Sequence, residues 1–402
     1  MMSFVSLSAL DERTSASDSG SSTLLASCTR VDSVPPLCCE VRVICAGVAH
    51  DDVQHSGAAG EPADDDESIV GARATADRVG FALSGIVERV GAGVRAFAVG
   101  NSVCALLPLR LCGACASHVI VPEQLLVPKL KRVSFALLAA SLSAASTAYA
   151  AVHVQCAVRA GHSALIINPC SVEALLVARL LAALHASVTV LVRDAAERAL
   201  LLSALPAQVR YLTDLHDSIS SGHRFDHIIE LRPCRAPGEP HVESVRVVEA
   251  LAAHGTWVVC HSKPRELTAA LSPPMMRKSA RLAFVFDHTW ASAATTRGTL
   301  AAALLDFQKR IVAQPDLLQL QQQPQASSNG NVDESETGTD DGALVVPQLA
   351  SFGIRPLDVR CFDAAEADSA VRHARATMQL QAVAIRFAPD PQPPTSAVSL
   401  LD

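Results

Sequence analysis

A turn with the sequence Asn-Pro-Cys-Ser-Val-Glu occupies residues 168–173, between an apolar run and a long helical pattern. At such a junction a helix N-terminus can hold an anion, because backbone N–H groups and the helix dipole both point at it. Asn168 and Ser171 carry side chains that donate hydrogen bonds. Pro169 lacks a backbone N–H, and Glu173 adds a negative charge that repels phosphate. The position of the turn therefore favours phosphate binding, whereas its residue types, without a glycine, oppose it.

Arg193 ends the strand pattern that follows the helix, directly before Asp194. A cation at this place in a dinucleotide-binding unit can pair with a 2′-phosphate. A surface arginine beside an aspartate accounts for the same two residues, and this alternative stays open. The segment from Ala164 to Asp194 is the first candidate for a binding site.

The cysteines offer a second kind of chemistry. The chain has 12 of them, and Cys112 and Cys115 form its one C-x-x-C pair. A structural zinc needs four donors, and no second pair follows; Cys104, upstream, lies in a strand pattern. A redox role also fits poorly, because thioredoxin-type pairs open a helix and this pair precedes a strand pattern. We expect buried or edge thiols, reduced in a cytoplasmic protein, since the N-terminal segment lacks the basic region of a signal peptide.

Two kinds of organised sequence must position these residues. Four strand patterns with glycine turns predict a compact β-domain between Glu40 and Val127: EVRVICAG, SGIVERVGAGV, GNSVCALLP and SHVIVPEQLLV. From Ser163 to Asp287 helical patterns alternate with six apolar strands: ALIIN, SVTVLV, VRYLT, DHIIEL, TWVVC and RLAFVF. This alternation predicts a doubly wound parallel sheet, with the turn at residues 168–173 after its first strand.

Composition limits the remaining classes. With 402 residues, of which 50% are apolar, the chain is long enough for two domains with cores. The net charge of −7 and the single basic cluster, Lys129–Arg132, argue against bulk electrostatic binding of nucleic acid. The charge-free stretch Val133–Val158 is long enough to span a bilayer, but it is mostly Ala and Ser and contains His153 and Gln155. We expect a buried helix there and no transmembrane segment.

Four segments resemble a known superfamily. Gly80–Val103 resembles the signature of the medium-chain dehydrogenases/reductases, in which glycines close turns of a GroES-like barrel. STAYAAV, Ser146–Val152, is similar to the T-A-Y segment of their zinc-independent quinone oxidoreductases, and Cys361–Ala374 to their C-terminal return. Leu271–Trp290 resembles the zeta-crystallin-like branch of quinone oxidoreductase-like proteins.

The resemblance spans about residues 36–387 and implies an α/β fold. It combines a GroES-like β-barrel domain with a Rossmann doubly wound parallel sheet. The expected order is a disordered tail (1–34), the GroES-like domain (35–133), the Rossmann nucleotide-binding-like domain (134–315), a low-complexity insertion (316–342), and a return to the GroES-like domain with a C-terminal tail (343–402). We expect a strand at Ala382–Phe387 in that return.

The resemblance also tests for catalytic zinc. Zinc alcohol dehydrogenases of this superfamily use the Cys of a G-x-C-H-x-D segment and the His of a G-H-E motif. Here Gly47–Asp52 has Ala49 at the thiolate position, which leaves His50 alone, and Gly80–Ala82 has Phe81 at the imidazole position. Catalytic zinc needs three protein ligands, so we expect no zinc.

The nucleotide turn of the quinone oxidoreductases reads approximately A-x-G-G-V-G, and the matching slot at residues 168–173 is shorter and has no glycine. We therefore expect NADPH, the one cofactor implied, to bind weakly or not at all. Thr147 lies where the family contacts the nicotinamide, with Tyr149 in the same segment, although helix packing accounts for both. The candidate cofactor-binding residues are Thr147, Asn168, Ser171 and Arg193; no catalytic residue is assigned.

Two functional hypotheses follow. In the first, the chain is a weak or inactive reductase, a pseudoenzyme that serves as a binding or scaffold subunit. The branch it resembles includes a subunit of an early-endosome Rab-effector complex linked to mRNA, which implies a cytoplasmic protein peripheral to early endosomes. In the second, it is an active NADPH-dependent reductase of a small quinone or enone. The missing glycines favour the first.

Overall fold

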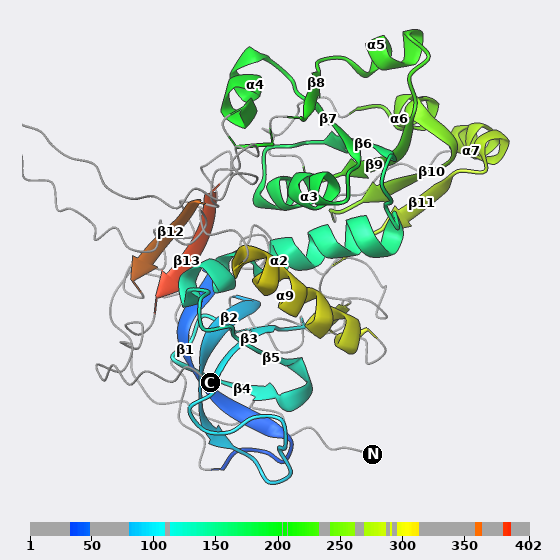
Figure 1. Ribbon diagram of the computed structural model, residues 1–402. Helices are drawn as coiled ribbons and strands as arrows, with labels where there is room; N and C mark the ends of the chain where they lie inside the picture. Colours follow the sequence, from blue (N-terminus) through cyan, green and yellow to red (C-terminus); the bar gives the residue numbers. More distant parts are fainter. Residues whose placement is uncertain are drawn as a thin grey trace, which may run out of the picture.

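The computed structural model describes residues 33–48, 80–108, 113–202, 204–206, 208–232, 242–261, 269–286, 290–291, 296–312, 358–363 and 381–386. These residues form two sheets, and two long helices lie between them (Figure 1). The low-complexity insertion expected at residues 316–342 lies outside the described residues.

The first sheet has seven strands in the order β12-β13-β1-β2-β3-β5, with β4 paired to β1. Their bounds are β1 Cys38–Val48, β2 Ala82–Val90, β3 Ser102–Leu106, β4 His118–Pro122, β5 Leu126–Pro128, β12 Asp358–Asp363 and β13 Gln381–Arg386. A core of apolar side chains, including Val41, Leu83 and Val121, packs within this sheet. The compact β-domain predicted from the alternating patterns is confirmed.

One expected strand is divided in the structure. The pattern SHVIVPEQLLV forms β4 and β5, and the 3-10 turn Glu123–Leu125 (η2) separates them. The carboxylate of Glu123 turns away to accept the backbone N–H of Arg95 at 2.6 Å. The strand is interrupted at Pro122 and at Glu123, whose side chain bonds to the loop that contains Arg95. The alternating pattern did not reveal this interruption.

The C-terminal strand returns to the first sheet, as Figure 1 shows at the red end of the chain. β13 pairs antiparallel with β1, with Ala384 opposite Gly47, and β12 pairs parallel with β13. The strand expected at Ala382–Phe387 is thus found one residue earlier. The domain limits themselves remain predictions.

The second sheet is parallel throughout, in the order β11-β10-β9-β6-β7-β8. Its strands are β6 Ser163–Ile167, β7 Ser187–Leu191, β8 Arg210–Leu212, β9 Phe225–Glu230, β10 Leu251–Val259 and β11 Arg281–Phe284. The crossovers carry α3 Val172–Ala183, α4 Ala195–Leu202, α5 Leu215–Ser220, α6 Ser244–Ala250, and η4 Ala269–Leu271 with α7 Ser272–Lys278. All six expected strands are present. The fifth starts earlier than expected because it follows α6 directly.

Both faces of this sheet are buried at its central strand, β6. Along β6, Leu165 and Ile167 pack in the cluster that contains residues of α5 and α6, whereas Ala164 and Ile166 pack with residues of α2 and α3. Strands covered on both faces read as continuous apolar runs, which is why the sequence identified them.

The charge-free stretch forms the central helix of the molecule. α2 spans Phe135–Tyr149, begins at Ser134, whose Oγ accepts the N–H of Leu137, and continues as a π-helix (η3) over Ala150–Gln155. Among the described residues this is the one helix long and apolar enough to cross a membrane, and 83% of its most apolar window is buried in the protein. α2 packs against β1, β2, α3 and α9 (Arg297–Val312). The expectation of a buried helix is confirmed.

Candidate functional site

A cavity of about 320 Å³ lies at the carboxyl ends of β6 and β7, next to the segments that follow β8 and precede α6. β7 flanks β6 on one side and β9 on the other, so the chain reverses its direction of travel across the sheet at β6. Ligands of doubly wound sheets bind outside the carboxyl ends of the strands at such a switch point. The cavity is therefore the candidate site.

The turn at one wall of the cavity keeps a sharp bend without glycine. Asn168 has φ of 60°, in the left-handed region, and its Nδ2 donates to the carbonyl of Leu231 at 2.9 Å. Asparagine is one of the few residues that adopt this conformation readily. Asn168 therefore takes over the conformational role of a glycine, and the missing glycines do not by themselves abolish the turn.

Ser171 serves the helix that follows it. It is the N-cap of α3: its Oγ accepts the N–H of Ala174 at 3.2 Å, and the residue is buried. One N–H that an anion would use at a helix N-terminus is thus satisfied internally. Ser171 does not contribute to the lining of the cavity.

Glu197 is a functional candidate that the sequence reasoning missed. This carboxylate in the first turn of α4 is only 6% exposed. Its Oε2 accepts the backbone N–H of Arg193 at 2.5 Å, and its Oε1 accepts the thiol of Cys170 at 3.1 Å. The sequence signal was Asp194-Ala195-Ala196-Glu197, a D-x-x-E capping pattern, and the Oδ1 of Asp194 does accept the N–H of Glu197 at 2.7 Å. Glu197 thus links the turn to the end of β7.

Arg193, the expected partner of a 2′-phosphate, faces an internal carboxylate instead. Its Nε lies 3.4 Å from Oε2 of Glu197. This pairing differs from the surface pair with Asp194 that the sequence left open. Arg193 and Asn168 both line the cavity, so the structure does bring two of the predicted residues together.

The rim of the cavity repeats this charge pattern. Arg246 lies 3.9 Å from Asp214 and 3.5 Å from Glu243, and all three side chains are about half exposed or more. The cavity lining contains two arginines, Arg193 and Arg246, and three carboxylates. Each lining guanidinium faces a lining carboxylate, and the lining has one more carboxylate than it has guanidinium groups.

Thr147 lies elsewhere, in the buried part of α2, and is not part of the cavity lining. Two residues further on, the Tyr149 ring lies 4.5 Å from that of His153 and 6.4 Å, edge-on, from Trp290. Together these rings pack around the junction of α2 with its π-helical continuation. A nicotinamide contact by Thr147 remains a prediction.

The positions that would carry zinc ligands are apolar where the structure describes them. Phe81 and Ala82 are buried at the start of β2, and Gly80 has φ of 91°. Burial raises the pKa of the Cys104 thiol to about 12, so it stays protonated. Ala49, His50 and Cys112 lie outside the described residues, within which no group of three or more potential ligands occurs. The absence of zinc remains a prediction.

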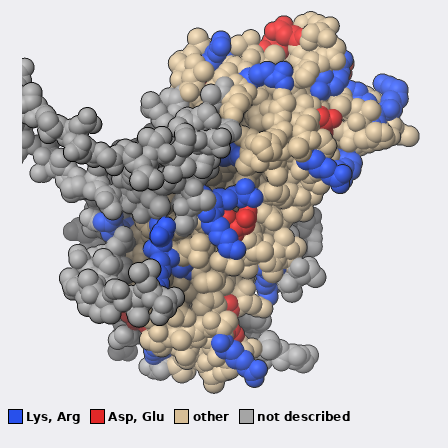
Figure 2. Space-filling model, viewed as in Figure 1, with Lys and Arg blue, Asp and Glu red and all other residues tan. Residues whose placement is uncertain are grey.

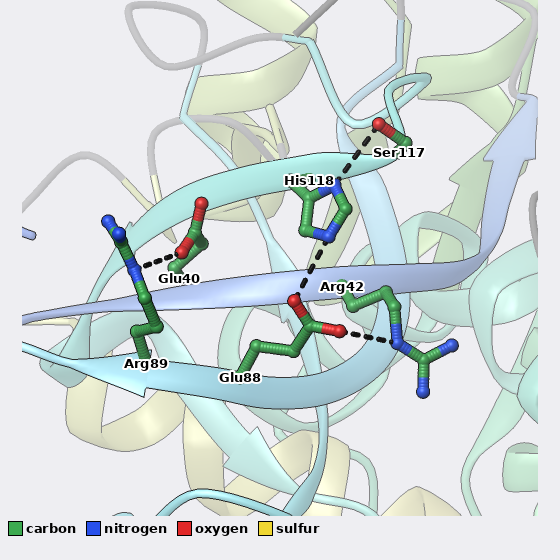
Figure 3. A network of polar contacts seen from close by, with 6 residues as sticks. All are labelled: Glu40, Arg42, Glu88, Arg89, Ser117 and His118. Atoms are coloured by element: carbon green, nitrogen blue, oxygen red, sulfur yellow. Dashed lines mark hydrogen bonds and ion pairs between the residues drawn. The ribbon is translucent and has the colours of Figure 1, made fainter. Parts of the chain in front are cut away.

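A second polar network lies on the first sheet, away from the cavity (Figure 3). The Glu88 carboxylate lies 2.8 Å from Nε of Arg42 and 3.1 Å from Nε2 of His118. Buried Glu40 pairs with Arg89 at 2.5 Å, and these two residues are opposite each other in β1 and β2. Such cross-strand pairs fix the register of neighbouring strands. We interpret the network as structural.

A histidine pair lies at the amino ends of β6 and β9, at the end of the strands opposite the cavity. His162 Nδ1 and His227 Nε2 are 2.9 Å apart. Nδ1 of His162 also accepts the N–H of Arg159, which leaves Nε2 of His227 as the donor in the contact between the two rings. Burial, followed by the neighbouring His162, lowers the pKa of His227 to about 4. Its Nδ1 has no hydrogen-bond partner within the described part of the chain.

Basic side chains on the face seen in Figure 2 form separate spots with uncharged surface between them. They do not form the continuous stripe that tracks a nucleic-acid backbone.

Comparison with known proteins identifies the fold. Residues 38–153 match the family model of the alcohol dehydrogenase GroES-like domain. A 2-haloacrylate reductase structure is similar with a TM-score of 0.64 at 16% identity, over 90% of this chain and 94% of that chain. The quinone oxidoreductase of Pseudomonas syringae pv. Tomato DC3000 gives 0.62 at 16%, over 89% and 94%.

A mycobacterial protein solved in complex with NADPH gives a TM-score of 0.60 at 16% identity, over 90% of this chain and 94% of that chain. No curated protein sequence matches the chain. Together these matches establish an α/β fold with a GroES-like domain and a Rossmann-like parallel sheet, as the sequence predicted.

Proposed function

We propose that the chain is a member of the medium-chain dehydrogenase/reductase superfamily, of the zinc-independent quinone oxidoreductase type, whose nucleotide site persists in outline only. The GroES-like domain match and the similarity to reductase structures over about nine tenths of the chain support the ancestry. The cavity at the switch point supports the position of the site.

The residues at this site do not fit the phosphates of NADPH. A dinucleotide turn offers backbone N–H groups and a helix N-terminus to the pyrophosphate. Here Pro169 lacks an N–H, Ser171 caps α3 with its own hydroxyl, and buried Glu197 occupies Arg193. The last of these observations carries the proposal. The chain is a weak or inactive reductase that serves as a binding subunit.

The alternative is an active NADPH-dependent reductase of quinones or enones. It is favoured by one observation, the left-handed Asn168, which preserves the turn. Quinone reduction asks little of the protein beyond holding cofactor and acceptor together, so a missing proton donor does not oppose it.

Within the superfamily we place the chain near quinone oxidoreductase-like protein 1. The support is the resemblance of Leu271–Trp290 to that branch, which implies a cytoplasmic protein in an early-endosome Rab-effector complex. Fractionation of cells expressing a tagged full chain tests this placement. We expect the protein in cytosol with a portion on early endosomes; confinement to mitochondria or to the medium would contradict it.

Turnover by the purified full chain tests the proposed function directly. NADPH oxidation is followed with 1,4-benzoquinone and with an enone as acceptors. We expect no turnover above the rate without protein. Saturable, protein-dependent oxidation would establish the alternative.

A further inference from the structure

We propose that Glu197 makes the cavity reject phosphate groups, so that the cavity accepts an uncharged nucleoside in place of a phosphorylated nucleotide. The inference rests on the proposed function, because it treats the cavity as a modified nucleotide site. It goes further by naming the residue that changes the ligand class.

The contacts of Glu197 support the rejection of phosphate. One carboxylate oxygen accepts the backbone N–H of Arg193, at the end of β7, at 2.5 Å. The other accepts the thiol of Cys170, in the turn after β6, at 3.1 Å. With the Arg193 guanidinium also near, the carboxylate holds donors that an incoming anion would need. An incoming phosphate would have to displace a buried charge or lie next to it, and both are unfavourable.

No lining cation compensates from the rim. Arg246 approaches Asp214 and Glu243, as Arg193 approaches Glu197. Two guanidiniums against three carboxylates leave the lining with a net negative charge. A cavity of this charge disfavours anionic ligands.

The rest of the cavity lining supports the binding of an uncharged nucleoside. Apolar side chains from the strand ends and their connections contribute most of the other walls: Ile167, Leu191, Val192, Leu215 and Val242. Carboxylates accept hydrogen bonds and donate none when ionised. Apolar walls with several acceptors suit a flat ring that carries hydroxyl and amino donors, and a nucleoside has this chemistry. The volume of about 320 Å³ lies in the range of small-molecule sites.

Calorimetric titration of the full chain with two probes tests the inference. The probes are adenosine and adenosine 2′,5′-bisphosphate, which share a nucleoside and differ in phosphates. For the unmodified chain we expect adenosine to bind at least about tenfold more tightly. Equal or tighter binding of the bisphosphate, or no detectable binding of adenosine, would overturn the inference without any variant.

Two matched substitutions locate the effect. Glu197→Gln removes the buried charge, and we expect affinity for the bisphosphate to rise by about tenfold or more, with adenosine affected less than about threefold. Glu249→Gln removes the same charge from an exposed position of α6 that does not line the cavity, and we expect changes below about threefold for both probes. Equal gains from both variants, or no gain from Glu197→Gln in protein that melts at the unmodified temperature, would contradict the assignment.

Turnover of NADPH and binding of adenosine are measured independently. NADPH turnover by the unmodified chain refutes the proposed function, whatever adenosine does. A chain that neither turns over NADPH nor binds adenosine refutes only the inference.

Discussion

Substitution of Asn168 tests whether this residue replaces a glycine in the turn. Asn168→Ala removes the hydrogen bond from Nδ2 to Leu231, worth about 1 kcal/mol, and leaves alanine in the left-handed region. The backbone strain adds about 1 kcal/mol, so we expect a loss of about 2 kcal/mol. Asn168→Gly loses the same bond without the strain, and we expect a loss of about 1 kcal/mol.

His185 provides the matched control. It also has a left-handed φ, 58°, just after α3, but its side chain is exposed. His185→Gly removes strain only, so we expect a gain of about 0.5–1 kcal/mol. Urea denaturation at constant m-value measures all three variants. If Asn168→Ala is as stable as Asn168→Gly, or Asn168→Gly is as favourable as His185→Gly, the reasoning is wrong.

Three further predictions concern the same domain. Because the pKa of His227 is lowered from 6.5 to about 4, its contribution to stability is complete above pH 6.5 and is lost as the pH falls towards 4. Between pH 7.5 and 5 the loss should be about 2 kcal/mol, and His227→Gln should show a smaller dependence in denaturation measured at both pH values. Lys278 Nζ donates to the carbonyls of Val248, Glu249 and Leu251 at the end of α6, so Lys278→Met should cost about 2 kcal/mol. Arg277 is the exposed neighbour of Lys278 on α7, and Arg277→Met should cost under about 0.5 kcal/mol. Equal losses from the two variants would show that Lys278 does not cap α6. Ser171→Gly with Glu173→Gly should improve NADPH binding in a titration, because it frees the N–H of Ala174 and removes a carboxylate that repels phosphate. No gain would contradict this prediction and would leave Glu197 or Pro169 as the block.

The fold was predictable because its signals are local. Two-sided apolar runs such as ALIIN identify the parallel strands, and glycine turns mark the β-domain. The break between β4 and β5 has a local signal in Pro122, but it also depends on the contact of Glu123 with Arg95, which is distant in sequence and could not be predicted.

The site was predictable in place but not in chemistry. Asn168 and Arg193 do line the cavity, as expected from their strand ends. The left-handed φ of Asn168 and its bond to Leu231 require β9 to lie beside β6. The burial of Glu197 requires Cys170 to approach from the preceding unit of the sheet. Tertiary contacts of this kind do not appear in a local pattern.

Calorimetric titration of the unmodified full chain with NADPH tests the central claim most directly. Charge-assisted hydrogen bonds contribute about 1.5–3 kcal/mol each, so losing two weakens binding by roughly two to four powers of ten. We predict a dissociation constant in the millimolar range or above. Micromolar binding would contradict the account, because it would mean that the turn, Arg193 and Glu197 hold phosphate after all.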